Sequence, residues 1–301
     1  MIRFNTKDYL NSCLDTSKII LKIIIPYYFL AELMLYLELM QDIAFVFEPI
    51  SDILNLPDKS SLAIAVGLLF QLYGAIAVGA SMGLSVYEWT ILGLFLGVAH
   101  ALPVESAILK KLGISWRFSI IFRLCMAYII ILPMQFIPPD LLFDDPNLVH
   151  EMIGPVTIIE NTGWISFSFS TIVNSLILAG EIIIVVSFAL FINQIIKGLK
   201  IVKNFGHNMS HIMSLTTGTL LGITYGSAIL IKEAKYLSKK QVFSVCCFLM
   251  IAHALIEDPL IFLIFGANLY VLIGFRIVLA ITVYVCIYFL YDKFIESSNT
   301  K

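Results

Sequence analysis

The sequence Ala99-His100-Ala101-Leu102-Pro103-Val104-Glu105 has a counterpart 153 positions later (100 to 253), Ala252-His253-Ala254-Leu255-Ile256-Glu257-Asp258. Each stretch places a histidine and a carboxylate inside a strongly apolar segment. With the same offset, residues 84–127 match residues 237–280 without an insertion. A register of this length is hard to reach by chance. We therefore infer an internal duplication whose matched residues include polar ones.

The composition places the chain in the membrane. Hydrophobic residues make up 59% of the sequence, charged residues 13%, and the mean hydropathy is +0.94, which lies far outside the range of soluble domains. Apolar runs reach the roughly 20 residues that a helix needs to cross a bilayer, whereas a barrel strand needs only about 10 alternating residues. We predict an all-α integral membrane protein. No basic run indicates nucleic acid as a partner.

Eight apolar segments follow one another, four in each half of the chain. The polar residues Met1 to Ser17 precede them without a signal-cleavage site, so the first segment is predicted to be a membrane helix. The segments run at about Ile19–Met40, Ser61–Met82, Val86–Gly113, Phe118–Phe136, Trp164–Ile196, Met213–Ile231, Phe243–Gly266 and Leu269–Tyr291. We divide the chain into a first membrane repeat (1–137), an acidic extracytoplasmic connection (138–163) and a second membrane repeat (164–301).

Lysine and arginine positions predict the topology. The basic N-terminal tail and the Lys197–Lys203 loop are expected in the cytoplasm, and the connection from Pro138 to Gly163, which has no basic residue, outside. Three crossings and one re-entrant hairpin per half place the basic segments inside and the connection outside. An odd number of crossings also makes the halves inverted repeats. Eight full crossings are the alternative. The motif segment, with its charges and a proline, is the natural candidate for the hairpin, although the Lys232–Lys240 cluster would then face outward.

Seven charged or titratable side chains repeat at the depth of the membrane centre, where each costs about 2.5 to 3.5 kcal/mol on insertion scales. They are expected to meet at the interface of the repeats. They are His100, Glu105, Arg123, His253, Glu257, Asp258 and Arg276.

Three interpretations compete for this set. Two histidines with two or three carboxylates suit a divalent transition metal, and His100, Glu105, His253, Glu257 and Asp258 are its candidate ligands. The same groups suit a proton relay that drives the movement of a solute. In the third interpretation they only pair with the two arginines and fasten the helices together. Each arginine could also sit at the lipid headgroups.

The two motifs are related but unequal. If the chain is helical there, His253 and Glu257 lie four residues apart on one face, whereas His100 and Glu105, five apart, align less well. The duplication equates Glu105 with Asp258, and Val104 with Glu257, so the second motif has one more acid.

Prolines and glycines punctuate both motifs. Pro103 and Pro259 are expected to break or kink their segments and to free backbone carbonyls for an ion or solute. Gly113 and Gly266 mark the predicted turns at the segment ends.

The repeated His-Ala-Leu-x-x-Glu/Asp element, followed by a glycine and Phe-Arg, resembles the nucleoside-recognition ("Gate") domain membrane proteins. The likeness covers about Leu62–Phe136 and Met213–Tyr291. That family is similar to concentrative nucleoside transporters, spore-maturation membrane proteins and the membrane part of ferrous-iron transporters. The resemblance implies inverted repeats, re-entrant hairpins and a solute or ion site between them. No nucleoside-binding residue is carried over, and no GTPase domain is present.

The expected function is therefore transport. We expect a permease or secondary transporter of the inner membrane, not an enzyme, with its N-terminus in the cytoplasm and a small solute or ion as substrate. No cofactor is certain, and a divalent transition metal remains a candidate. A non-transporting scaffold subunit is the alternative, and a metal-dependent enzyme acting on lipid is a third. A homo-oligomer or a partner membrane subunit is left open.

Overall fold

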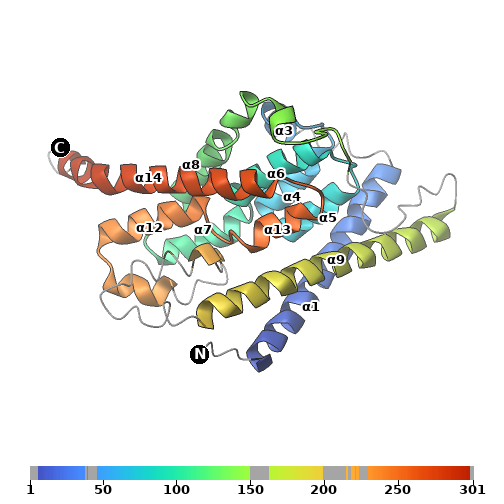
Figure 1. Cartoon of the computed structure of the whole chain (residues 1–301), viewed down its shortest axis with the longest axis horizontal. Coiled ribbons are helices and arrows are strands. Elements are labelled where there is room, and N and C mark those ends of the chain that lie inside the picture. The colour runs from blue at the N-terminus through green and yellow to red at the C-terminus, as the bar shows by residue number, and fades with distance from the viewer. Residues whose placement is uncertain are drawn as a thin grey trace.

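The computed structural model describes residues 6–37, 39, 46–149, 163–198 and 230–298, together with 215, 218–220, 222 and 223. Apart from one isolated β-bridge, the regular elements of this described part are all helices (Figure 1). The α-helices are α1 (Thr6–Tyr36), α3 (Glu48–Ile53), α4 (Ser60–Leu69), α5 (Leu72–Ala80), α6 (Val86–Ala99), α7 (Leu102–Lys111), α8 (Trp116–Ile129), α9 (Trp164–Gly198), α12 (Lys239–Ile251), α13 (Glu257–Leu263) and α14 (Leu269–Ser298). Short 3-10 helices cover Leu132–Gln135, Pro139–Leu141 and Ala234–Tyr236.

Five helical spans in the described part are long and apolar enough to cross a membrane. They are Tyr9–Tyr36, Val86–Lys111, Trp116–Gln135, Trp164–Ile192 and Leu269–Tyr291. The predicted all-α membrane class is confirmed. The first helix begins earlier than expected: α1 starts at Thr6, within the polar N-terminal tail.

The segment expected to cross at Ser61–Met82 instead folds back on itself. A Cβ at Gly67 would lie 3.1 Å from Ala75 Cβ, and one at Gly74 would lie 2.7 Å from Val66 Cγ1. On a continuous helix, residues eight apart are separated by about 12 Å along the axis. The α4 and α5 arms therefore form a hairpin. Its tip is Phe70–Gln71, and Lys59 at its start donates a hydrogen bond to the Met82 carbonyl at its end.

We expected the motif segments to be broken or re-entrant, and the structure shows helices broken in the middle. His100 has an extended backbone (φ −70°, ψ 161°) and the next residue, Ala101, a left-handed one (φ 49°). Ala254 repeats that conformation in the second motif (φ 47°). Pro103 and Pro259 fall in the first turns of α7 and α13, where the missing N–H has no helical partner to lose. In each motif the break precedes the proline, by two residues at Ala101 and by five at Ala254.

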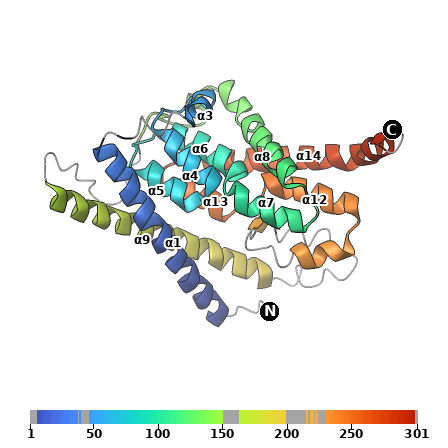
Figure 2. The same cartoon turned by 180° about the vertical axis from the view of Figure 1, so that it is seen from behind.

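The two broken helices run in opposite directions. In Figure 1 the chain passes from α6 leftward into α7, and from α12 rightward into α13; the reverse view in Figure 2 agrees. Their N-terminal caps also match, because Ser85 with Glu88 and Ser238 with Gln241 each form a capping box. Gly113 and Gly266 both have positive φ, 88° and 77°, after the ends of α7 and α13.

The long helices α1 and α9 pack against each other as an antiparallel pair beside this core (Figures 1 and 2). Tyr9 contacts Phe191 near one end, with ring centroids 6.0 Å apart, and Tyr36 contacts Trp164 near the other, at 5.1 Å. Large apolar side chains remain on the outside of the molecule, Ile165 and Tyr270 among them. Such surfaces fit contact with lipid.

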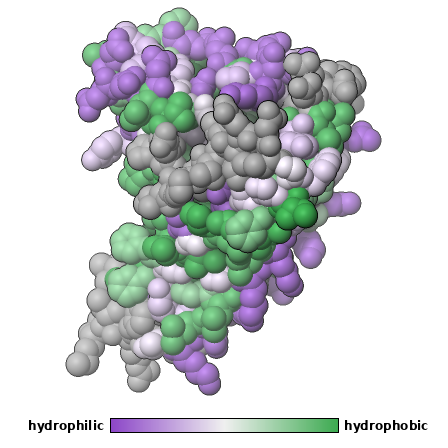
Figure 3. Space-filling view, turned by 90° about the vertical axis from the view of Figure 1, so that its right-hand side faces the viewer, coloured by the Kyte–Doolittle hydropathy of each residue, from purple (hydrophilic) through white to green (hydrophobic). Residues whose placement is uncertain are grey.

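The end of α14 lies at one end of the long axis, on the left in Figure 1. The start of α6 and the described part of the acidic connection lie together at the opposite end. Val86 N–H there donates to the Leu148 carbonyl at 2.8 Å. Asn268, just before α14, donates to the Leu142 carbonyl there at 2.8 Å. Figure 3 looks onto this end and shows hydrophilic residues over its upper part, a band of apolar residues across the middle, and further hydrophilic residues along the lower right edge. Residues 150–162 of the connection lie outside the described residues.

Candidate histidine and glutamate site

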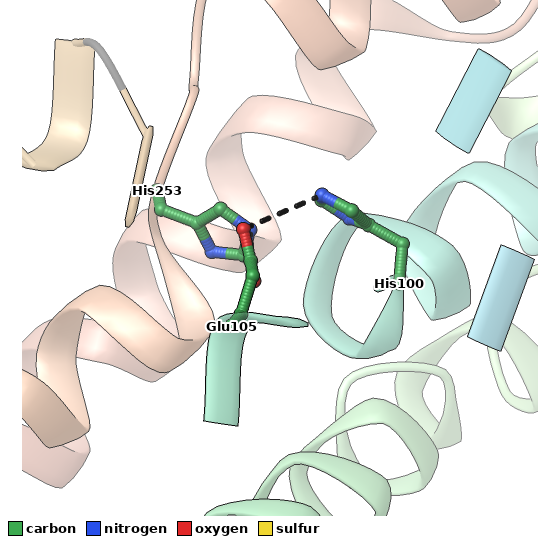
Figure 4. A group of neighbouring side chains, drawn as sticks. All are labelled: His100, Glu105 and His253. Atoms are coloured by element: carbon green, nitrogen blue, oxygen red, sulfur yellow. Dashed lines mark ion pairs between the residues drawn. The ribbon is translucent and has the colours of Figure 1, made fainter. Parts of the chain in front are cut away.

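The two helix breaks bring His100, His253 and Glu105 together (Figure 4). The imidazole centroids are 5.0 Å apart. Glu105 in α7 reaches both rings, with Oε2 3.5 Å from His253 Nε2 and Oε1 3.9 Å from His100 Nε2. All three residues are buried, and the exposed fraction of Glu105 is 2%. Residues from both halves of the chain therefore form one cluster.

Backbone contacts orient the two imidazoles in the same way. His100 Nδ1 lies 2.7 Å from the Leu96 carbonyl, and His253 Nδ1 lies 2.9 Å from the Leu249 carbonyl. A carbonyl oxygen only accepts, so each Nδ1 carries the hydrogen in these contacts. In a neutral ring this leaves the Nε2 lone pair directed to the Glu105 side of the cluster, free to accept a proton or to bind a metal.

Two buried arginines donate hydrogen bonds to backbone carbonyls at the helix breaks. Arg123 donates to the Val98 carbonyl through Nε and to the His100 carbonyl through Nη2, both at 2.7 Å. Arg276 repeats the pattern on Ile251 (3.0 Å) and His253 (2.5 Å). These donors satisfy carbonyls that a helix end leaves without partners. The arginines are therefore buried among helix ends and are not at the lipid headgroups.

Each arginine also holds the matched carboxylate of its own half. Arg123 Nη2 lies 2.8 Å from Glu105 Oε2, and Arg276 Nη1 lies 3.5 Å from Asp258 Oδ2. The equivalence of Glu105 and Asp258 inferred from the duplication thus has a structural counterpart. Only Glu105 among the described carboxylates belongs to the cluster with the two histidines.

Glu257 takes a different position from the one its spacing suggested. The left-handed residue Ala254 interrupts the helix, so the i, i+4 relation to His253 does not apply. Glu257 Oε1 instead accepts a hydrogen bond of 2.5 Å from the hydroxyl of Tyr73, on the α4–α5 hairpin.

A cavity of about 240 Å³ opens beside the cluster. Apolar residues share its lining with Gln71, Tyr73, His100, Glu105, His253, Glu257 and Asp258. Sequence reasoning missed Gln71 and Tyr73 as part of the site. The signals were present: a glutamine at the centre of an apolar run, and the match of Tyr73-Gly74 with Tyr225-Gly226. Residues 225 and 226 lie outside the described part.

The cluster offers the donors of a metal site. One ligand atom from each of His100, Glu105 and His253 lies within 4.8 Å of the other two. Zinc bonds of about 2.0 to 2.2 Å require donor atoms only a few ångströms apart, and imidazole with carboxylate suits several divalent transition metals. Arg123 would orient the Glu105 carboxylate from behind.

Comparison with known proteins supports the membrane assignment. No protein-family model matches the chain, and no solved structure matches it. It is 22% identical over 293 residues, covering 93% of each chain, to a protein of Bacillus subtilis (strain 168) named "Uncharacterized membrane protein YvoD". The five apolar spans point the same way. This chain is a multi-pass membrane protein.

Proposed function

We propose that the chain is a transport protein, not an enzyme, that moves a small solute or ion past His100, Glu105 and His253. The observation that carries this proposal is the buried cluster itself. It lies where both broken helices meet and borders a cavity lined by the hairpin tip. Titratable side chains at such a position mark substrate or ion pathways in membrane proteins.

The proposed architecture is a pair of inverted repeats, each with three crossings and one hairpin. Support comes from the opposite directions of α6–α7 and α12–α13 (Figure 1) and from the helix breaks repeated at Ala101 and Ala254. Inverted repeats with discontinuous helices around a central site are a common transporter plan. This plan also fits the resemblance to the Gate-domain proteins, a membership we propose on the motif residues.

The orientation follows from the basic residues at the end of the molecule where α14 ends (Figure 1). α7 ends there with Lys110 and Lys111. The Lys232–Lys240 cluster at the start of α12 lies close to this end of α7, as shown by Leu112 and Leu237, which line the same small apolar space. We propose that this end faces the cytoplasm across the cell's inner membrane. Placing the hairpin before the motif, as in α4–α5, removes the conflict that the lysine cluster posed.

The donor set favours a divalent transition metal as substrate. Two neutral imidazoles and one carboxylate suit iron, zinc and manganese. Three protein donors beside a cavity leave positions for water, so an ion can arrive and leave.

The alternative is a scaffold subunit without transport, and one observation favours it. Arg123 already pairs with Glu105 at 2.8 Å, as a purely structural ion pair would. A buried pair of this kind needs no solute to persist.

Uptake into proteoliposomes separates the two. We expect vesicles with the wild-type protein to take up Mn²⁺, Co²⁺ or Zn²⁺ faster than empty vesicles, as measured with an enclosed indicator dye. Glu105→Gln keeps the side-chain shape but removes the charge, and should abolish the excess uptake. The exposed Asp140→Asn should retain it. No uptake of any of the three ions by the wild type, or equal uptake by Glu105→Gln, would overturn the metal-transport proposal.

A further inference from the structure

The Tyr73 side chain connects the tip region of the α4–α5 hairpin to the second half of the chain. The Tyr73 hydroxyl donates to Glu257 Oε1 at 2.5 Å across 184 positions of sequence. Tyr73 stands at the second position of α5 and its exposed fraction is only 6%. The contact thus spans the cavity between the hairpin and α13.

The other arm of the hairpin is held by the backbone of the first half. Ala101 N–H, at the break between α6 and α7, donates to the Gly67 carbonyl in α4 at 2.8 Å. A comparable backbone contact exists in the second half, where Leu255 N–H donates to the Thr219 carbonyl at 2.9 Å. Backbone contacts of this kind therefore occur in both halves.

The carboxylate contact, by contrast, has an acceptor in only one half. The duplication places Val104 opposite Glu257. Val104 lines the same cavity, but its side chain has no hydrogen-bonding group. A tyrosine facing Val104 could not form the contact that Tyr73 forms with Glu257.

Both ends of the hairpin lie at the same end of the molecule. Lys59 and Met82, its two ends, are joined by a hydrogen bond, and α6 begins shortly after Met82, at the end of the molecule opposite the end of α14 (Figure 1). The tip reaches from that end to the cavity beside His100 and His253. Moving the tip would expose the cluster toward that end.

We propose that Tyr73 and Glu257 form a latch that keeps the α4–α5 hairpin over the histidine and glutamate cluster, and that solute reaches the cluster from the end opposite the end of α14 when this latch opens. The inference rests on the proposed transport function. It makes Glu257 a positioning residue and not a ligand of the solute. At the matched position of the first half, Val104 offers no acceptor for an equivalent latch.

Accessibility of the hairpin tip tests the latch. In a background without Cys13, Cys125, Cys246, Cys247 and Cys286, the buried residue Leu72, which lines the cavity beside the hairpin tip, is replaced by cysteine, and reaction with a membrane-impermeant maleimide is timed. Tyr73→Phe keeps the ring and removes the hydroxyl, and should raise the rate about tenfold, as expected for one hydrogen bond to a charged group. Tyr27→Phe, whose ring lies 5.9 Å from that of Phe70 at the same tip, is the matched control and should keep the parent rate.

Coupling between the two residues distinguishes a latch from a general loosening of the fold. Glu257→Leu should raise the rate as Tyr73→Phe does, and the two changes together should add nothing further. Glu257→Gln, which keeps an acceptor oxygen, should restore most of the slow reaction. Additive effects, or an unchanged rate in Tyr73→Phe, would overturn the proposal.

Hydrogen–deuterium exchange provides a second measurement if the cysteine-free background does not fold. Peptides covering residues 60–82 should exchange faster in Tyr73→Phe than in the wild type, and equal exchange would contradict the latch. Both readouts are independent of transport. Faster labelling of Tyr73→Phe without metal uptake in any variant would support the latch and refute the proposed function. Metal uptake by the wild type with unchanged labelling of Tyr73→Phe would support the proposed function and refute the latch.

Discussion

Arg123 and Arg276 have the same task at the residue scale: each supplies donors to a helix that stops inside the membrane. Arg276 has one additional partner, since its Nη2 also donates to the Gly97 carbonyl of the first half at 2.7 Å. Gly97 lies close to this guanidinium, since a Cβ there would lie 3.2 Å from Nη1, which is tighter than an ordinary contact. The matched position in the second half is Met250. Arg276 therefore joins the two halves, and we regard it as structural.

Replacing Arg276 should destabilise the protein severely. Arg276→Met leaves the Asp258 carboxylate and three carbonyls without their donor, and removing one partner of a buried pair costs about 3 to 5 kcal/mol. We expect a large fall in the apparent unfolding temperature of the purified protein in detergent. Arg117→Met, at an exposed position of α8, should change it little. Equal, small shifts in both variants would show that the Arg276 contacts contribute no stability.

The duplication register predicted which residues would meet better than local spacing did. Matching His100 with His253, and Glu105 with Asp258, anticipated both the central cluster and the carboxylates that pair with the arginines. Spacing failed for Glu257 because it assumed a continuous helix, whereas Ala254 has φ 47°. The contact between Tyr73 and Glu257 could not be predicted, since it depends on how a hairpin folds across the other half.

At the element scale, hydropathy located the apolar segments but could not tell a crossing from a hairpin. The run from Ser61 to Met82 is long enough for one crossing, and it is equally compatible with two arms of about 15 Å each. The arms become distinguishable only through close contacts, such as that of Gly74 with Val66. Gln71, at the centre of the run, was the one polar signal for the tip.

The prolines show a related limit of sequence reasoning. Pro103 and Pro259 correctly indicated that the motif segments are discontinuous. Their position in the first turns of α7 and α13 shows that they begin the second helix of each pair. The residues that break the chain are the alanines before them, whose left-handed conformation no propensity scale favours.

At the scale of the whole molecule, the arrangement of ends predicts a topology that can be measured. Exposed residues Asp144 and Lys235 lie toward opposite ends of the long axis in the proposed orientation. Single cysteines at these two positions should react with an impermeant maleimide from opposite sides of the membrane, position 144 from outside and position 235 from the cytoplasm. Reaction of both from one side would exclude the proposed plan with a hairpin before the motif in each half, and reaction of position 144 from the cytoplasm would reverse the orientation.

The central claim is that His100, Glu105 and His253 form a ligand site and do not merely fasten the helices. Calorimetric titration of Mn²⁺, Co²⁺ and Zn²⁺ into the purified protein in lipid nanodiscs tests it most directly. We predict that at least one of these ions binds at one per chain. The binding should be lost in Glu105→Gln and His253→Ala and retained in Glu257→Gln, all three still folded. Absence of binding in the wild type, or the same stoichiometry in folded Glu105→Gln, would contradict the claim and assign the cluster to structure alone.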